Sequence, residues 1–211
     1  MRSPKTSTLI RRAGSHLPLR LLTADRAFLR DLARVQILSA ELADRYHYAH
    51  LKGGCRRPLG RLEAAVLITR RNLGVAGASP ATLYQFASDS VARAFGSALP
   101  ATGARRSDYH ELLTSRAYFA LGCPEDFRLA ARMTEAEVER CSDCRPDAVY
   151  TDPRTGELVM VEADSGHYTT RQIRTKVERW AAAGLRQVWA QPVQGAGAAV
   201  PRRSGIGVLR L

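Results

Sequence analysis

The chain has 211 residues, and 45% of them are hydrophobic, which is enough to bury one large core or two small ones. Its 32 Lys and Arg residues outnumber its 20 Asp and Glu residues and give a formal net charge of +12. An excess of this sign favours nucleic acid as the partner. No apolar run reaches the roughly 20 residues that span a bilayer, and the N-terminus lacks the apolar core of a secretory signal. We therefore expect a globular, cytoplasmic protein without a membrane role.

The N-terminal segment is basic and has no sustained apolar periodicity. Residues 1–20 carry several Lys and Arg side chains and no acidic one. This pattern predicts a mobile basic arm, which either follows a DNA backbone or has no function.

A helical pattern begins after this arm. Thr23 is the expected N-cap of a first helix, which places Phe28, Leu29 and Leu32 on one face. A second helix is predicted to begin at Ser39, and a Gly-Gly pair then separates it from a third.

The third predicted helix is rich in arginine and is followed by two β-prone runs, at residues 66–71 and 82–86. A Gly-rich segment between the runs is typical of a hairpin tip, and a short helix at 88–95 closes the unit. Helix, helix, basic helix and hairpin is the order of a winged-helix domain, which places the third helix in a DNA major groove. We expect this domain to span residues 21–104. The residues expected to contact DNA are Arg56, Arg57, Arg61, Arg70 and Arg71.

Residues 105–211 are predicted to form a second domain, after a linker-like segment that ends near residue 104. The predicted elements are a helix at 107–121, strands at 148–152 and 158–163, a helix capped by Thr169, and strands at 185–193 and 206–211. A hairpin followed by a helical crossover predicts an α/β domain with a mixed sheet flanked by helices.

Three carboxylates of this second domain are predicted to converge. If Asp152 and Glu157 flank the hairpin turn, Asp147 lies opposite Glu162, and Asp164 shares the face of Glu162 because side chains alternate along a strand. Like charges that face each other on a sheet repel, so the group indicates a bound divalent cation such as Mg²⁺ or Mn²⁺. A register shifted by one residue would instead leave an ordinary solvated hairpin edge.

The helix after these strands carries Gln172 and Lys176 outside its apolar stripe. Lys176 is placed to reach back to the acids, where it would stabilise the charge that develops on a phosphate. The alternative is an ordinary surface lysine.

These residues form a recognisable series: Pro146-Asp147, then Glu162-Ala163-Asp164, then a helix with Gln172 and Lys176. The series resembles the PD-(D/E)xK nucleases of the restriction-endonuclease type, over about residues 107–193. The usual lysine of that family stands two residues after the glutamate, where this chain has Asp164; in some members it has moved to the next helix, where Lys176 lies. The resemblance implies that Asp147, Glu162 and Asp164 hold Mg²⁺ or Mn²⁺ and that Lys176 assists.

With a winged helix ahead of it, the series also resembles plasmid replication-relaxation proteins and the mobilisation relaxases built on this nuclease fold. That resemblance implies nicking of double-stranded DNA at a plasmid origin, together with other mobilisation proteins. It also implies that Glu111 is a further acid near the metal and that His110 is its neighbour. Tyr109 and Tyr168 lie close to the motifs as candidate nucleophiles, although such tyrosines more often serve packing.

Two other classes of function remain open. One is a DNA-binding initiator or accessory protein whose nuclease fold has lost its activity, which the replacement of the usual lysine by Asp164 favours. The other is a zinc or redox regulator that uses Cys141 and Cys144, whose spacing suits a metal pair, with Cys123 as a third ligand.

Overall fold

The computed structural model describes residues 9–11, 18–73, 81–97, 99, 108–141, 144–192, 200 and 205–211. The chain is a mixed α/β protein that divides into two compact units, Met1–Leu99 and Pro100–Leu211. The division falls close to the boundary expected after residue 104. The predicted linker at 99–107 and the predicted hairpin tip at 74–80 lie almost wholly outside the described residues.

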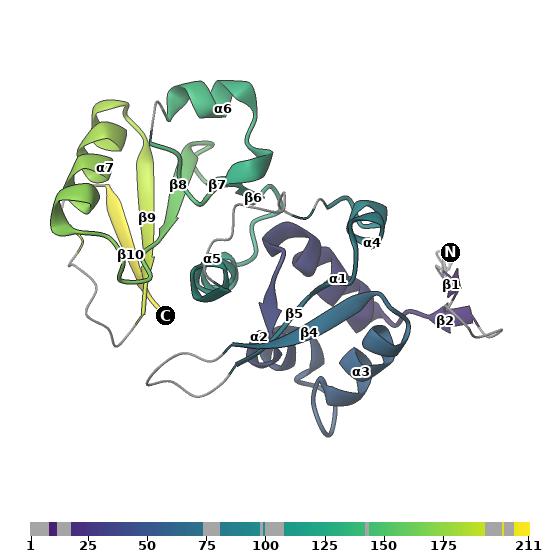
Figure 1. Ribbon diagram of the computed structural model, residues 1–211. Helices are drawn as coiled ribbons and strands as arrows, with labels where there is room; N and C mark the ends of the chain where they lie inside the picture. The colour runs from purple at the N-terminus through teal and green to yellow at the C-terminus, as the bar shows by residue number, and fades with distance from the viewer. Residues whose placement is uncertain are drawn as a thin grey trace. The chain divides into compact units, whose positions relative to one another are not determined.

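The N-terminal unit contains a three-stranded antiparallel sheet in the order β3-β5-β4, with helices before and after the β4–β5 hairpin (Figure 1). Its elements are β1 (Leu9–Arg11), β2 (Pro18–Arg20), α1 (Thr23–Val35), β3 (Leu38–Ser39), α2 (Ala40–Ala43), the π-helical turn η1 (Asp44–Tyr48), α3 (Arg56–Ala64), β4 (Ile68–Leu73), β5 (Ala81–Phe86) and α4 (Asp89–Ala94). The predicted helices, the hairpin and their order are confirmed.

One prediction for the start of this unit is wrong. The N-cap of α1 is Leu22, not Thr23, and Asp25 accepts a 2.8 Å hydrogen bond from the Leu22 backbone N–H. The carboxylate of the first turn thus supplies the capping contact that we expected from a hydroxyl. The segment expected to be a mobile arm contains β1 and β2, which pair antiparallel, and its mobility stays a prediction.

The second predicted helix begins as expected, because Ser39 caps α2 and its hydroxyl accepts a hydrogen bond from the Leu42 N–H at 3.2 Å. Apolar residues of α1 and α3 form the core of the unit. The fully buried ones are Phe28, Leu29, Leu32, Leu59 and Leu62.

The C-terminal unit is built on a five-stranded mixed sheet in the order β10-β9-β8-β7-β6 (Figure 1). Strands β8, β9 and β10 are parallel, and β7 is antiparallel to both β8 and β6. Its elements are α5 (Asp108–Ala120), β6 (Arg128–Leu129), the 3-10 turn η2 (Ala130–Arg132), α6 (Glu135–Arg140), β7 (Ala148–Thr151), β8 (Leu158–Ala163), α7 (Thr170–Ala182), β9 (Arg186–Gln191) and β10 (Ile206–Arg210). The predicted mixed sheet is confirmed. The sequence analysis does not predict β6 or α6, although Thr134 and Glu137 form a capping box at the start of α6.

Helix α7 covers one face of this sheet. Its apolar stripe of Ile173, Val177 and Trp180 packs on Met160 and Trp189 of the strands, and all five side chains are fully buried. Helix α5 packs against β8 and β9. The start of α7 is well defined because Thr169 and Gln172 form a capping box, as the predicted cap at Thr169 requires.

Candidate active site

The two central carboxylates of the C-terminal unit face each other across β7 and β8. Ala148 pairs with Val161, so Asp147 lies opposite Glu162, and the predicted register is confirmed. The Asp147 backbone N–H donates to the Val161 carbonyl at 3.0 Å, which continues the ladder to this residue. Asp147 is 3% exposed and Glu162 is fully buried, so neither charge is solvated by bulk water.

The two oxygens of Glu162 have different surroundings. Oε1 accepts hydrogen bonds from the Tyr168 hydroxyl, at 2.5 Å, and from the Lys176 ammonium. Oε2 is buried and has no hydrogen-bond partner among the described residues. Burial and the neighbouring charge of Asp147 raise the pKa of the Glu162 carboxyl to about 7, against the opposing attraction of Lys176.

Lys176 comes from α7, as predicted, and its ammonium is held by several groups. It forms the ion pair with Glu162, lies 3.4 Å from the Tyr168 hydroxyl, and lies 5.2 Å from the ring centroids of both Tyr168 and Trp180. Such cation–π contacts stabilise a cation that has lost water. Gln172, which belongs to the same sequence series, instead serves the helix cap, where its Oε1 accepts a hydrogen bond from the Thr169 N–H at 2.8 Å.

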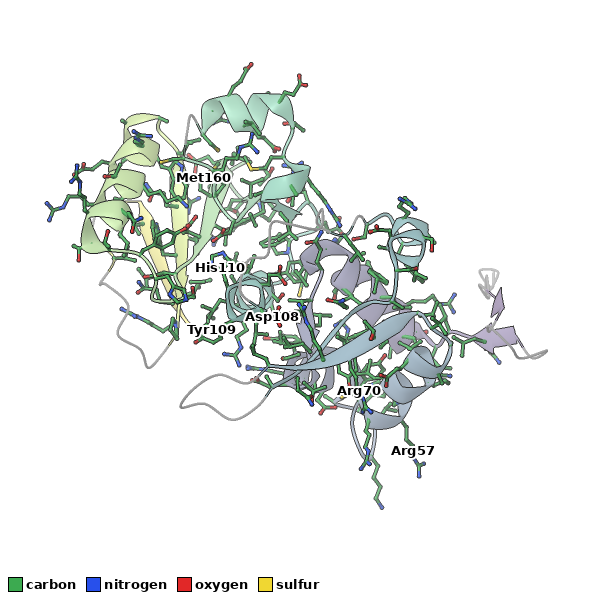
Figure 2. The ribbon with its side chains drawn as sticks, in the orientation of Figure 1. Arg57, Arg70, Asp108, Tyr109, His110 and Met160 are labelled. Atoms are coloured by element: carbon green, nitrogen blue, oxygen red, sulfur yellow. The ribbon has the colours of Figure 1, made fainter. Side chains whose placement is uncertain are left out.

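Asp147 also has contacts on both oxygens. Oδ2 accepts the Ala163 N–H at 2.8 Å, and Oδ1 lies 2.9 Å from Nε2 of His110, which projects from α5 (Figure 2). The structure thus brings His110 to the acids. Glu111, the next residue on α5, is half-buried and is not among the residues described as lining the pocket beside this site.

Both side-chain oxygens of Asp164 are held by groups outside the acid pair. Asp164 is fully buried, its Oδ1 accepts the Gly166 N–H, and its Oδ2 accepts the Gln191 side-chain amide, both at 2.9 Å. Its backbone N–H donates to the Ala190 carbonyl at 2.9 Å, and the chain then turns through Gly166, whose φ is +90°. Among the described residues no group of three His, Cys, Asp or Glu side chains is arranged to hold a metal ion.

A pocket of about 370 Å³ opens beside the acid pair. Asp147 and His110 line it together with Tyr168 and Lys176, and Glu162 lies behind the last two. Sequence reasoning missed three other lining residues, Arg145, Ser165 and His167. Arg145 could have been found, because it directly precedes the Pro146-Asp147 motif, whereas nothing in the pattern distinguishes His167. The basic side chains of the wall suit a phosphate group.

The arginines expected to contact DNA in the N-terminal unit fall into two groups. Arg56 and Arg57 are exposed on α3, and Figure 2 shows Arg57 projecting outward. Arg61 is ion-paired with the fully buried Asp25 of the same unit, and its contact with DNA stays a prediction. On β4, Arg70 lies 3.3 Å from Glu63, and Arg71 is half-buried.

The cysteines show no cluster in the described residues. Cys141 is buried in the core with its sulfur 3.4 Å from that of Met160, and burial raises the pKa of its thiol. Cys123 and Cys144 are half-buried and form no disulfide. The structure therefore offers no support for the zinc alternative.

No family model matches the chain, and searches of curated proteins and of solved structures return no significant match. In the described part of the chain, no helix has the length and apolar character needed to cross a membrane.

Proposed function

We propose that the chain is a divalent-metal-dependent DNA endonuclease that nicks a DNA strand, with a PD-(D/E)xK-like catalytic domain. The observation that carries the proposal is that Asp147 and Glu162 face each other, buried, with Lys176 of the following helix bound to Glu162. The acid pair and the lysine are the groups that the sequence resemblance names. Their convergence beside one pocket supports the proposed nuclease function.

The donor set suits a cation that takes few protein ligands. Glu162 Oε2 is a buried, partnerless oxygen, and Asp147 adds a second carboxylate directly opposite. Mg²⁺ is commonly held by one or two carboxylates and completes its coordination with water and substrate phosphate. Mg²⁺ or Mn²⁺ therefore fits these residues better than a metal that needs a closed protein cage.

Each side chain has a role that follows from its contacts. Asp147 and Glu162 would hold the ion, which supplies a polarised phosphate and an acidified water when bound. Lys176 would offset the negative charge that develops on the phosphate, and Arg145 of the pocket wall would bind the phosphate oxygens. Asp147 also orients the His110 ring beside the reacting group.

The N-terminal unit supports a winged-helix assignment and hence double-stranded DNA as the partner. Its sheet order β3-β5-β4, with α2 and α3 between β3 and the β4–β5 hairpin, is that of a winged helix. The exposed Arg56 and Arg57 on α3 and the net charge of +12 favour phosphate contacts. By the sequence resemblance, we propose action in the cytoplasm at a plasmid origin, in mobilisation or replication, alongside other mobilisation proteins.

A second candidate is a DNA-binding initiator or accessory protein without activity. The observation that favours it is that Asp147 and Glu162 each already contact a basic side chain, His110 and Lys176 respectively. In this case the acid pair would be a structural remnant.

Nicking of a supercoiled plasmid that carries a candidate origin separates the two candidates. We expect wild type to nick in Mg²⁺ and to stop in chelator, and Asp147→Ala to bind the same DNA without nicking it. The matched control is Asp126→Ala, a half-exposed acid of the same unit that lies outside the pocket lining. Binding without nicking by wild type in Mg²⁺ and in Mn²⁺ would favour the inactive initiator.

A further inference from the structure

Each carboxylate of the acid pair has at least one oxygen held by groups of the protein. Asp147 Oδ2 accepts the Ala163 backbone N–H at 2.8 Å. Glu162 Oε1 accepts both the Tyr168 hydroxyl, at 2.5 Å, and the Lys176 ammonium. Of the two other oxygens, Glu162 Oε2 is buried without a partner among the described residues, whereas Asp147 Oδ1 lies 2.9 Å from His110 Nε2, so a cation on Oδ1 would compete with that contact.

We infer that Tyr168 is a positioning residue that restricts Glu162 to a single ligating oxygen and thereby selects small, octahedral cations of the Mg²⁺ and Mn²⁺ class over Ca²⁺. This inference rests on the proposed function, because it takes the acid pair to be the metal site. It adds discrimination against Ca²⁺ and a residue that the nuclease pattern does not name.

The discrimination follows from how the two ions use carboxylates. Ca²⁺ takes six to eight oxygens at roughly 2.3–2.6 Å and often chelates a carboxylate through both oxygens. Mg²⁺ requires near-octahedral geometry at roughly 2.0–2.1 Å and binds carboxylates through single oxygens. A glutamate whose Oε1 is held by two donors cannot chelate without breaking those hydrogen bonds, so Ca²⁺ loses a ligand that Mg²⁺ does not need.

Tyr168 is well placed to impose this restriction because its ring is held from two sides. It lies in the segment between β8 and α7, edge-on to the fully buried Trp189 with ring centroids 6.3 Å apart. The Lys176 ammonium lies 5.2 Å from the Tyr168 ring centroid. The hydroxyl is therefore a fixed donor toward Glu162, whereas a surface tyrosine would adjust to whichever ion entered.

The test compares Mn²⁺ and Ca²⁺ affinities of the full chain without DNA. Mn²⁺ binding is followed by paramagnetic quenching of tryptophan fluorescence, and Ca²⁺ binding by competition with Mn²⁺. Tyr168→Phe keeps the ring and removes the hydroxyl. We expect its Mn²⁺ affinity to fall about tenfold or more, as is usual for lost outer-shell hydrogen bonds. We expect Ca²⁺ affinity to fall less or to rise, so that the Mn²⁺/Ca²⁺ ratio drops.

Tyr150→Phe is the matched control, since Tyr150 is a buried tyrosine of β7 on the face of the sheet opposite to Asp147. It should leave both affinities unchanged. A general loosening of the fold would weaken both ions alike, so an unchanged ratio in Tyr168→Phe overturns the inference. Loss of nicking with both affinities intact overturns it too, since the hydroxyl would then act in the reaction itself.

The two proposals fail in different ways. If wild type nicks DNA with Mg²⁺ but Tyr168→Phe keeps the wild-type ion ratio, only the role of Tyr168 is wrong. If wild type binds Mn²⁺ selectively and Tyr168→Phe loses that selectivity, but no DNA is cleaved, the nuclease is wrong and the cation site is correct. If wild type binds neither ion, both proposals are wrong.

Discussion

Replacement of Glu162 by glutamine should stabilise the metal-free C-terminal unit at alkaline pH. The change keeps the shape of the side chain and removes a fully buried negative charge next to Asp147. Burial and Asp147 raise the pKa of the Glu162 carboxyl from an ordinary 4.5 to about 7 in the folded protein. The ionised form is thus the less favourable one, even with Lys176 beside it.

The sign and size of the effect follow from proton linkage. Because the folded-state pKa is above the unfolded one, the folded protein binds more protons between pH 4.5 and about 7, and stability from this group rises as pH falls through that window. The two pKa values differ by about 2.5, and each pH unit is worth about 1.4 kcal/mol, so the ionised carboxylate costs the folded state about 3 kcal/mol at pH 8. Glutamine, like the protonated acid, avoids that cost.

Urea unfolding followed by tryptophan fluorescence measures this directly. Both tryptophans of the chain, Trp180 and Trp189, are fully buried in the C-terminal unit, so the signal reports that unit alone. In chelator, the free energy of unfolding of Glu162→Gln should exceed that of wild type by up to about 3 kcal/mol at pH 8. The two free energies should be equal near pH 5. Glu139→Gln, at an exposed site on α6, is the control and should track wild type at every pH.

Two results would refute this reasoning. If Glu162→Gln is less stable than wild type at pH 8, the ion pair with Lys176 outweighs the burial of the charge. If the difference in free energy of unfolding between variant and wild type does not vary with pH, Glu162 does not titrate between pH 5 and pH 8. Adding Mg²⁺ should reverse the order, since an ion that binds the native state stabilises wild type and does less for the variant.

Three further outcomes concern the N-terminal unit. The logarithm of DNA affinity should fall linearly with the logarithm of salt concentration. The double variant Arg56→Ala with Arg57→Ala should make this slope shallower by about 2, because each phosphate contact contributes about 0.9 to it. An unchanged slope would mean that α3 does not face DNA. Arg61→Ala should lower the free energy of unfolding by about 2 kcal/mol. This loss is smaller than for a fully buried ion pair because the Arg61 side chain is 35% exposed beside Asp25. Thermal unfolding followed by circular dichroism measures the loss, and DNA affinity at low temperature should change little. Burial lowers the pKa of His47 below its ordinary 6.5, so the stability that neutral His47 contributes to the folded unit is lost as pH falls below 6.5. His47→Gln should therefore reduce the pH dependence of stability, measured by hydrogen exchange of the α1 amides.

The acid pair and its lysine could be predicted from the sequence because local rules place them. The four-residue turn between Asp152 and Glu157 determines the register of the hairpin, and strand alternation then puts Asp147 opposite Glu162. Helical spacing put Lys176 outside the apolar stripe of α7 and within reach of the acids. These steps need no information beyond a short stretch of chain.

The contacts that no local pattern predicts join distant or irregular segments. His110 reaches Asp147 only because α5 packs against the sheet, and no sequence periodicity encodes that approach. Tyr168 lies between β8 and α7, where no repeating pattern indicates direction. Strand alternation places Asp164 on the face of Glu162, but it does not predict that Gly166 and Gln191 bind its two carboxylate oxygens.

The same limit explains Arg61. Its position on a basic helix predicts a solvated side chain that contacts phosphate, and helical spacing alone gives no reason to doubt that. Asp25, on α1, is fully buried, and it also accepts a hydrogen bond from the Tyr48 hydroxyl at 3.2 Å. A buried carboxylate needs a cation or several donors, and Arg61 is the cation that the tertiary structure brings to it.

Charge balance connects the pH prediction with the proposed metal. Asp147 and Glu162 bring two negative charges into a buried site, and Lys176 offsets one of them. His110 beside Asp147 offsets the other only when it is protonated, whereas a bound divalent ion would do so at any pH at which it stays bound. A site that had become a scaffold would gain stability from an amide in place of either acid, since the free acids repel. Two buried carboxylates, with Oε2 of Glu162 left without a donor among the described residues, therefore support the proposed cation site.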